Sequence, residues 1–211
     1  MRRITAYSDY KSPYAYLAKD PINRLAAECG VTLQWLPYTL DIPAYLGSAR
    51  LGPDGKVVEE SRNAHQWRRV RYSYMDCRRQ ARKVGLVIRG TQKIWNSVPA
   101  HIGMLWAQRA GDDVFHRYHD RVFERFWKRE LDIEDQSVLE AVLAECGAPV
   151  AGFGDYLAGE GQAEHDRVRA EAEAKGVFGV PSILVPQDSG EDDLFWGREH
   201  LDDIRAMLRA G

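Results

Sequence analysis

Two segments near opposite ends of the chain carry the residue types and spacing best suited to chemistry. The first is Ser12-Pro13, which follows a strand-like segment and opens an apolar periodic run. Serine at an N-cap followed by proline at the first helical position is typical of a helix start. Unpaired N–H groups and a partial positive charge at such an end lower the pKa of a thiol placed there. On the dipeptide alone, a plain helix cap is the more common explanation.

The second segment is GVFGVPS at residues 176–182, where Gly179 and Pro181 flank Val180. This pattern indicates a special turn just before a strand. X-Pro bonds are cis in only about 5–6% of folded cases, so the residues alone leave an ordinary trans proline equally open. A further candidate is Arg198-Glu199, which opens the last predicted helix and could help bind an anion there. A carboxylate that simply complements the helix dipole explains Glu199 equally well.

The chain has few residues that could bind a metal or supply a reactive thiol. Three cysteines, Cys29, Cys77 and Cys146, lie far apart, which excludes a C-x-x-C pair and favours a reducing compartment. We interpret each as a small buried hydrophobe. His116 and His119 have a spacing that can bind a metal, but no further ligand set accompanies them, and we expect no metal site.

Hydrophobic patterning indicates a mixed α/β chain. Four short strands are predicted at residues 3–9, 31–38, 182–185 and 192–197. Helices are predicted at 13–30, 62–84, 98–110, 114–128, 137–146, 161–175 and 198–209. Gly30 marks the end of the first helix, and Pro21 suggests a kink or break within it. Residues 47–60 have loop-like composition and are interpreted as a loop.

The order of these elements predicts the fold. The β-α-β start implies a parallel pair of strands, and the closing strands imply a hairpin. Removing the helical block leaves β-α-β…β-β-α, which is the thioredoxin order. We therefore predict a discontinuous thioredoxin-like domain (residues 1–60 and 161–211) with a large all-helical insertion (residues 61–160).

Composition narrows the class of protein. The 211 residues are 45% hydrophobic and 28% charged, with a net charge of −2, which excludes a disordered or strongly basic chain. No stretch is long enough to span a membrane, and no secretory signal is evident, so we expect a cytoplasmic protein. Residues 62–93 contain ten lysines or arginines and one acid, Asp76. They form either a solvated face or an attractor for an anionic ligand; nucleic-acid binding is disfavoured.

Three motifs in this order, SPYAYLA, GVFGVPS and LFWG with its following helix, resemble the DsbA-like superfamily. Within it they resemble the branch of 2-hydroxychromene-2-carboxylate isomerases and kappa-class glutathione transferases. The resemblance implies a glutathione cofactor and a cis Pro181. It also implies that Ser12 contacts the glutathione thiolate and that the Val180 backbone pairs with the cysteinyl unit. Ser12 and Ala15 occupy the positions of the usual cysteines, so a ligand must supply any reactive thiol.

Other positions match the resembled branch less closely. Glu199 stands where the branch usually has an aspartate for the γ-glutamyl group, and we expect Arg198 and Glu199 to contact glutathione. Asp41 and Tyr45 fall near a position where a lysine is usual. Tyr14 and Asn96 are candidates for the substrate pocket, although Asn96 could instead cap the helix that follows it.

The predicted function is that of a glutathione-dependent isomerase acting on an aromatic or conjugated small molecule. A kappa-class-like transferase is the first alternative. The second is a DsbA-family thiol-disulfide oxidoreductase homologue, or a non-catalytic binding module that lacks the C-x-x-C motif. A homodimer is expected from the resemblance.

Overall fold

A four-stranded mixed sheet forms the centre of the computed structural model, which describes residues 2–187 and 190–210. Its strand order is β2-β1-β5-β6. The strands are β1 (Arg3–Ser8), β2 (Thr32–Pro37), β5 (Ser182–Pro186) and β6 (Asp192–Trp196). β1 pairs in parallel with β2 and antiparallel with β5, and β5 pairs antiparallel with β6. The predicted parallel start and closing hairpin are therefore confirmed.

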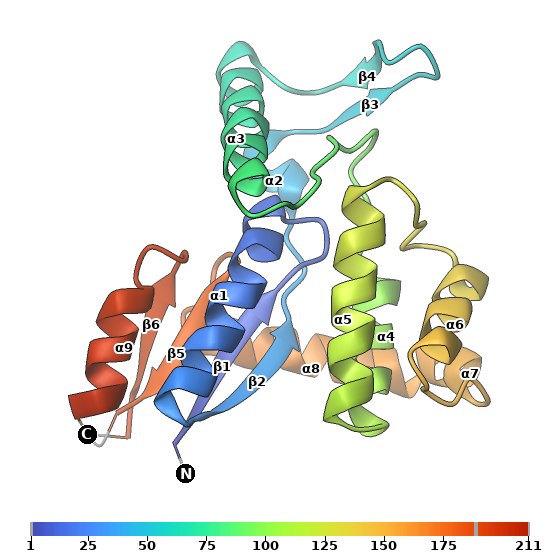
Figure 1. Ribbon diagram of the computed structural model, residues 1–211. Coiled ribbons are helices and arrows are strands. Elements are labelled where there is room, and N and C mark those ends of the chain that lie inside the picture. The colour runs from blue at the N-terminus through green and yellow to red at the C-terminus, as the bar shows by residue number, and fades with distance from the viewer. Residues whose placement is uncertain (1, 188–189, 211) are drawn as a thin grey trace.

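Helices cover both faces of this sheet. In Figure 1, α1 (Pro13–Cys29) and α9 (Leu201–Ala210) lie in front of it, and α8 (Glu160–Ala174) passes behind. α1 continues through Pro21 without a break and ends at Gly30, whose φ of 62° places it in the left-handed region. Pro21 has no N–H to donate to the Leu17 carbonyl one turn earlier. A guanidinium nitrogen of Arg198 donates to that carbonyl instead, at 3.3 Å.

The predicted helical block is also present. It contains α3 (Ala64–Lys83), α4 (Val98–Arg109), α5 (Asp112–Trp127), α6 (Gln136–Glu145) and the short α7 (Phe153–Ala158). α7 was not predicted, because six residues carry too little periodicity to indicate a helix. α4 contacts both β2 and α8, and one buried cluster extends from the sheet into the helices. The division into two domains stays a prediction.

Residues 47–60 differ from the predicted loop, and a short helix that was not predicted precedes them. The helix is α2 (Ile42–Leu46), and the predicted loop contains a separate hairpin of β3 (Ala49–Leu51) and β4 (Val57–Glu60). The loop prediction was wrong because the signal for this hairpin is weak: all four residues of β4 are exposed, and β3 has only three residues, too few to show an alternation. An Arg50–Glu59 ion pair and a turn closed by the Gly52 N–H on the Lys56 carbonyl connect its strands.

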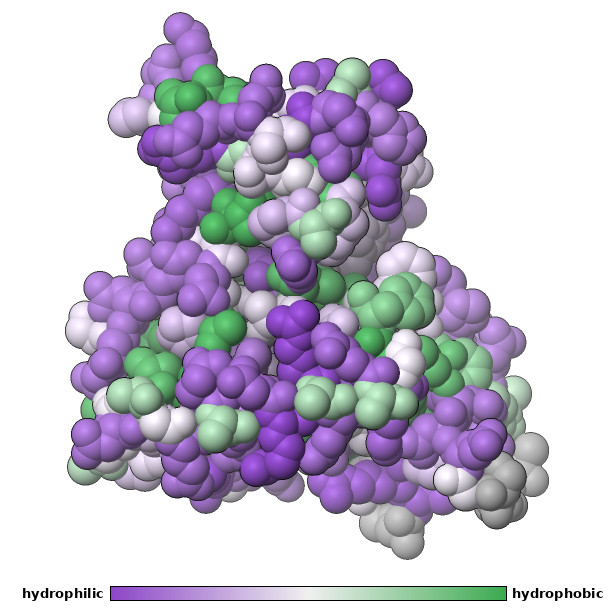
Figure 2. Space-filling model, turned by 180° about the vertical axis from the view of Figure 1, so that it is seen from behind, coloured by the Kyte–Doolittle hydropathy of each residue, from purple (hydrophilic) through white to green (hydrophobic). Residues whose placement is uncertain are grey.

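The hairpin and α3 form a lobe beyond one end of the sheet (Figure 1). Seen from the opposite side, this lobe stands above a broader body, and hydrophobic residues gather where the two meet (Figure 2). No helix among the described residues is long and apolar enough to cross a bilayer.

Candidate active site

Ser12 is placed at the point where β1 passes into α1. It is the N-cap of α1, and its Oγ accepts the Ala15 N–H at 3.2 Å. A serine hydroxyl has two acceptor lone pairs and one donor proton, so this cap leaves the proton available. Pro13 has no N–H, and within the described residues the Tyr14 N–H has no hydrogen-bond partner. The helix start therefore offers two donors, one hydroxyl and one amide.

The opposite wall is the segment before β5. The Val180-Pro181 peptide bond is cis, as the resemblance implied. Pro181 accepts the Gly197 N–H through its carbonyl, and the Ser182 hydroxyl donates to the Gly179 carbonyl. In the described residues the backbone N–H and C=O of Val180 have no partner of their own. An extended peptide-like ligand could pair with them as an added strand does.

Both walls open into one cavity of about 850 Å³. Its lining comes from the start of α1, from α2 and α3, from residues 90–95, from residues 178–180 and from Trp196. The cavity thus lies between the lobe and the sheet. Ser12, Tyr14 and Val180 are all among its lining residues, so the structure brings together three of the predicted site residues.

The charged side chains that line this cavity are all positive. None of its lining residues among those described is acidic. Seven of them are cationic: Lys11, Arg62, Arg69, Arg71, Arg78, Lys93 and Arg129. Lys11 and Lys93 have carboxylate partners elsewhere, Asp9 and Glu134. In the described part of the chain the five arginines make no ion pair with a carboxylate. The basic segment predicted from residues 62–93 therefore contributes to the wall of a cavity as well as to a solvated face.

Aromatic side chains complete the lining. Phe178 and Trp196 form a pair at the cis-proline wall, with ring centroids 5.4 Å apart and more than half of the Phe178 surface exposed. Tyr14 donates its hydroxyl to Asp76 Oδ2 at 3.2 Å, and burial followed by the neighbouring Cys77 and Asp76 raises the tyrosine's pKa. Tyr45 also lines the cavity. An anionic ligand with a flat conjugated ring system fits this combination of cations and aromatic faces.

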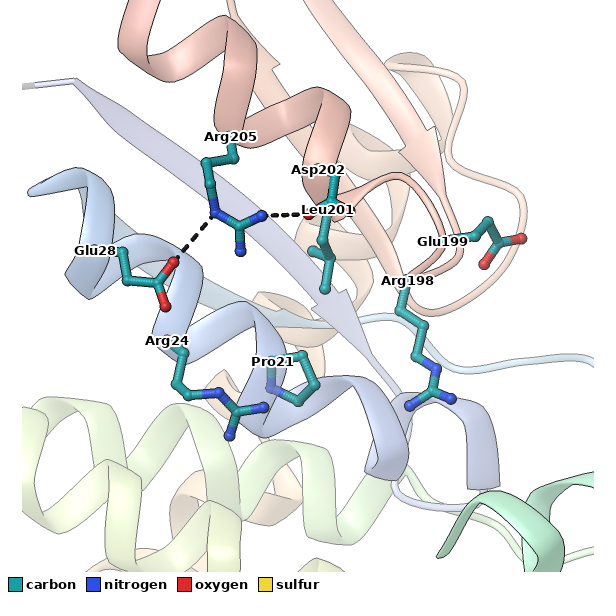
Figure 3. A pocket seen from close by; sticks show the side chains of 8 residues that line it. All are labelled: Pro21, Arg24, Glu28, Arg198, Glu199, Leu201, Asp202 and Arg205. Carbon is teal, nitrogen blue, oxygen red and sulfur yellow. Dashed lines mark hydrogen bonds and ion pairs between the residues drawn. The ribbon is translucent and has the colours of Figure 1, made fainter. Parts of the chain in front are cut away.

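Two predicted contacts, Arg198 and Glu199, lie elsewhere in the structure. They line a separate hollow of about 250 Å³ between α1 and α9, together with Arg24 and Arg205. In Figure 3, Glu199 points away from the other side chains of this hollow, and Arg205 bridges Glu28 and Asp202. The Arg198 side chain is the one that donates to the carbonyl freed by Pro21. The structure therefore does not place either residue on the lining of the larger cavity.

Asn96 and Asp41 both accept a backbone N–H at the start of a helix. Asn96 Oδ1 accepts the Val98 N–H at 3.1 Å at the start of α4, and Asn96 is not part of the cavity lining. Asp41 caps α2 by accepting the Ala44 N–H at 3.3 Å. These contacts favour the capping interpretation that the sequence left open for Asn96.

The cysteines do not supply a thiol to this site. All three are free, and none of them is among the lining residues of the cavity. Burial raises the pKa of Cys77 to about 12, which keeps it a neutral thiol. A reactive thiolate in the cavity must therefore come from a ligand.

One residue in contact with the site was not predicted: Asp9, just after β1. It is fully buried, and its carboxylate accepts the backbone N–H groups of Lys11 and Leu40. Both of these residues line the cavity. A single acidic residue at the end of a predicted strand was the available signal, but two of its partners, Leu40 and His101, are distant in sequence.

Fold and site together define a class: a thioredoxin fold with a helical insertion, a cis-proline wall, and serine where a helix start meets the cavity. The model of the DSBA-like thioredoxin domain matches residues 3–209, and the chain therefore belongs to this family. The match covers nearly all of the described structure.

The similar proteins include 2-hydroxychromene-2-carboxylate isomerases and a disulfide reductase. The chain is 25% identical to a 2-hydroxychromene-2-carboxylate isomerase of Sphingobium xenophagum, over 98% of each chain. It is similar to the structure of a 2-hydroxychromene-2-carboxylate isomerase with a TM-score of 0.73 and 21% identity, covering 99% of this chain and 95% of the other. It is also similar to the cytosolic disulfide reductase DsbM from Pseudomonas aeruginosa, solved with GSH (TM-score 0.62, 18% identity, coverage 99% and 98%). These structural likenesses show the fold.

Proposed function

We propose that this protein is a glutathione-dependent isomerase of an anionic aromatic or conjugated small molecule. The observation that carries the proposal is the arrangement at Ser12: a hydroxyl proton and a helix N-terminus face a cavity that has no thiol of its own. Relatives over the full length of the chain are named as 2-hydroxychromene-2-carboxylate isomerases, which supports this class of reaction and a small-molecule substrate.

The residues present fit glutathione. The free N–H and C=O of Val180 suit the cysteinyl backbone, and the hydroxyl of Ser12 and the N–H of Tyr14 suit its sulfur. The one-sided positive charge of the lining suits its two carboxylates. When bound, glutathione supplies a nucleophilic thiolate to a conjugated substrate. Ser12 holds that sulfur ionised, because a hydrogen bond to the charged form and the α1 dipole both lower a thiol's pKa.

The remaining lining residues orient the substrate. Arg69 and Arg71 on α3 supply charge for a carboxylate, and the Phe178–Trp196 pair supplies a face for a conjugated ring. α3, the cis-proline wall and Ser12 all line the same cavity, so a substrate bound there is within reach of each of them. A transferase would use the same arrangement with the adduct as product. Cytoplasmic location and a homodimer stay predictions.

The test is calorimetric titration with glutathione, combined with measurement of the bound thiol's pKa from thiolate ultraviolet absorbance. Replacing Ser12 by alanine removes one hydrogen bond to a charged sulfur, worth about 1.5–3 kcal/mol, so the bound thiol's pKa should rise by about one to two units. Ser73→Ala removes another serine of the cavity lining, away from the helix start, and should leave that pKa unchanged.

Two results would contradict the proposal at different levels. Absence of heat and of affinity with the wild-type protein would refute a glutathione-dependent function. Unchanged binding and an unchanged thiol pKa in Ser12→Ala would retain the ligand but remove Ser12 from the mechanism.

A further inference from the structure

A buried carboxylate lies directly beneath the candidate site. Asp9 is fully buried and follows β1. Its Oδ1 accepts the Lys11 N–H at 3.1 Å and its Oδ2 accepts the Leu40 N–H at 2.8 Å. Its backbone carbonyl accepts the Ser12 N–H at 2.9 Å. One residue thus fixes the segment that precedes Ser12 and the segment that follows β2.

From this carboxylate a chain of buried polar groups extends to the surface. His101 Nε2, on α4, lies 3.3 Å from Asp9 Oδ1, an ion-pair contact without the angle of a hydrogen bond. His101 Nδ1 lies 2.7 Å from the Thr39 hydroxyl, and that hydroxyl lies 2.9 Å from His165 Nε2 on α8. His165 Nδ1 lies 3.3 Å from Asp166, whose side chain is exposed.

The donors and acceptors of this chain determine its charge. A threonine hydroxyl donates one hydrogen bond, so it can donate to only one of the two histidines and accepts from the other. If Thr39 donates to His165, then His101 must donate from Nδ1, and a proton at its Nε2, 3.3 Å from Asp9 Oδ1, makes the ring an imidazolium. If Thr39 donates to His101, then His165 must donate from both nitrogens to reach Asp166. If a proton lies at each contact from Asp9 to Asp166, one of the two histidines is therefore an imidazolium.

The surroundings favour the inner position for that proton. Burial alone would raise the pKa of the Asp9 carboxyl, but His101, then Lys11 and the Leu40 N–H, hold that pKa well below its usual range. Burial, and after it the charge of His101, lowers the pKa of His165. Three other titratable or charged groups face the rings of His101 and His165: Tyr10 beside His101, His119 on α5 and Arg169 on α8. His119 disfavours a positive charge on His101, and Arg169 disfavours one on His165.

We propose that Asp9 is a positioning residue for the thiol site and that His101, Thr39 and His165 form a chain that keeps a compensating proton beside it. The Asp9 carboxylate connects two walls of the cavity through the backbone of Lys11 and Leu40. Together with Lys11, whose Nζ lies 3.6 Å from Asp9 Oδ2, the imidazolium of His101 offsets a negative charge that would otherwise oppose a thiolate at Ser12. This inference rests on the proposed function where it concerns the thiolate.

Thr39 allows the chain to be broken without removing any charged group. Thr39→Val keeps the shape of the side chain but leaves His101 Nδ1 without a partner, which disfavours the imidazolium. Thr39→Ser restores the hydroxyl and is the matched control. Ring nitrogen chemical shifts of the free protein report on His101, and thiolate absorbance reports on bound glutathione.

The proposal predicts that both ring nitrogens of His101 carry protons at neutral pH in the wild type and in Thr39→Ser, and that one proton is lost in Thr39→Val. It also predicts that the bound thiol's pKa rises by about one unit in Thr39→Val, since a nearby positive charge has gone. An unchanged His101 in Thr39→Val would overturn the chain, and an unchanged thiol pKa would overturn its effect on the site. If glutathione does not bind at all, the proposed function fails, while the shifts of His101 still decide the chain.

Discussion

Replacing Asp9 by asparagine tests how strongly one buried carboxylate holds the two walls of the cavity. The carboxylate accepts two backbone N–H groups, at 3.1 Å and 2.8 Å, and contacts His101 at 3.3 Å. The amide keeps one acceptor oxygen. Its NH2 group faces the second backbone N–H, so that donor loses its partner.

The expected loss of stability follows from these contacts. A hydrogen bond to an ionised acceptor contributes about 1.5–3 kcal/mol, and a buried donor left unpaired costs about 1–3 kcal/mol. The sum, about 2.5–6 kcal/mol, spans the usual cost of about 3–5 kcal/mol for removing one partner of a buried ion pair. Urea unfolding at neutral pH measures this difference. Asp135→Asn is the matched control: Asp135 also accepts two backbone N–H groups, but at the exposed start of α6, where asparagine caps equally well.

The pH dependence checks the cause. Asp9 has a folded-state pKa well below that of the unfolded chain, mainly because of His101 and then Lys11, acting against burial. Its contribution to the free energy of unfolding is therefore complete above the unfolded-state pKa of about 3.9 and is lost as the pH falls below it. The gap between wild type and Asp9→Asn should narrow from pH 6 towards pH 3. A gap of the same size at both pH values would refute the electrostatic explanation and leave only altered packing.

Two further predictions concern the walls of the cavity. A Cβ at Gly179 would lie 2.8 Å from Trp196 Nε1, so Gly179→Ala should displace the indole from Phe178. A fluorescence titration should then show binding of a conjugated ligand weakened about three- to tenfold. Unchanged affinity would exclude a role for the Phe178–Trp196 pair. Arg69→Gln should weaken binding of an aromatic carboxylate about two- to fivefold and reduce its salt dependence, whereas Arg68→Gln, one position along α3 and outside the lining, should not. Equal losses in both variants would indicate a general effect of net charge.

The sheet and most helices could be predicted because their signals are local. Alternation marks β2, and the Ser12-Pro13 cap and Gly30 mark the ends of α1. The β3–β4 hairpin could not be predicted, since β4 is exposed along its whole length and β3 is only three residues long. Within the site, the predictions for Ser12 and Pro181 rest on motifs that are contiguous in the chain.

The residues that sequence could not assign depend on contacts between distant segments. Asp9 contacts Leu40 and His101, and no local pattern indicates either pairing. Arg198 was expected at the glutathione site from its place at a helix start. Its side chain instead compensates a carbonyl that a proline in another helix leaves free, which only the packing of α9 against α1 reveals.

The two interpretations of Ser12, a helix cap and a contact to a thiolate, are not alternatives in this structure. The cap uses a lone pair of Oγ, which accepts the Ala15 N–H at 3.2 Å, and leaves the hydroxyl proton for another acceptor. Ser12→Ala removes both roles, and they can be measured separately. Loss of the cap lowers the free energy of unfolding by about 1 kcal/mol without any ligand, and loss of the proton changes only the bound thiol's pKa. A variant that lost stability but kept the wild-type thiol pKa would show that the serine is a cap and nothing more.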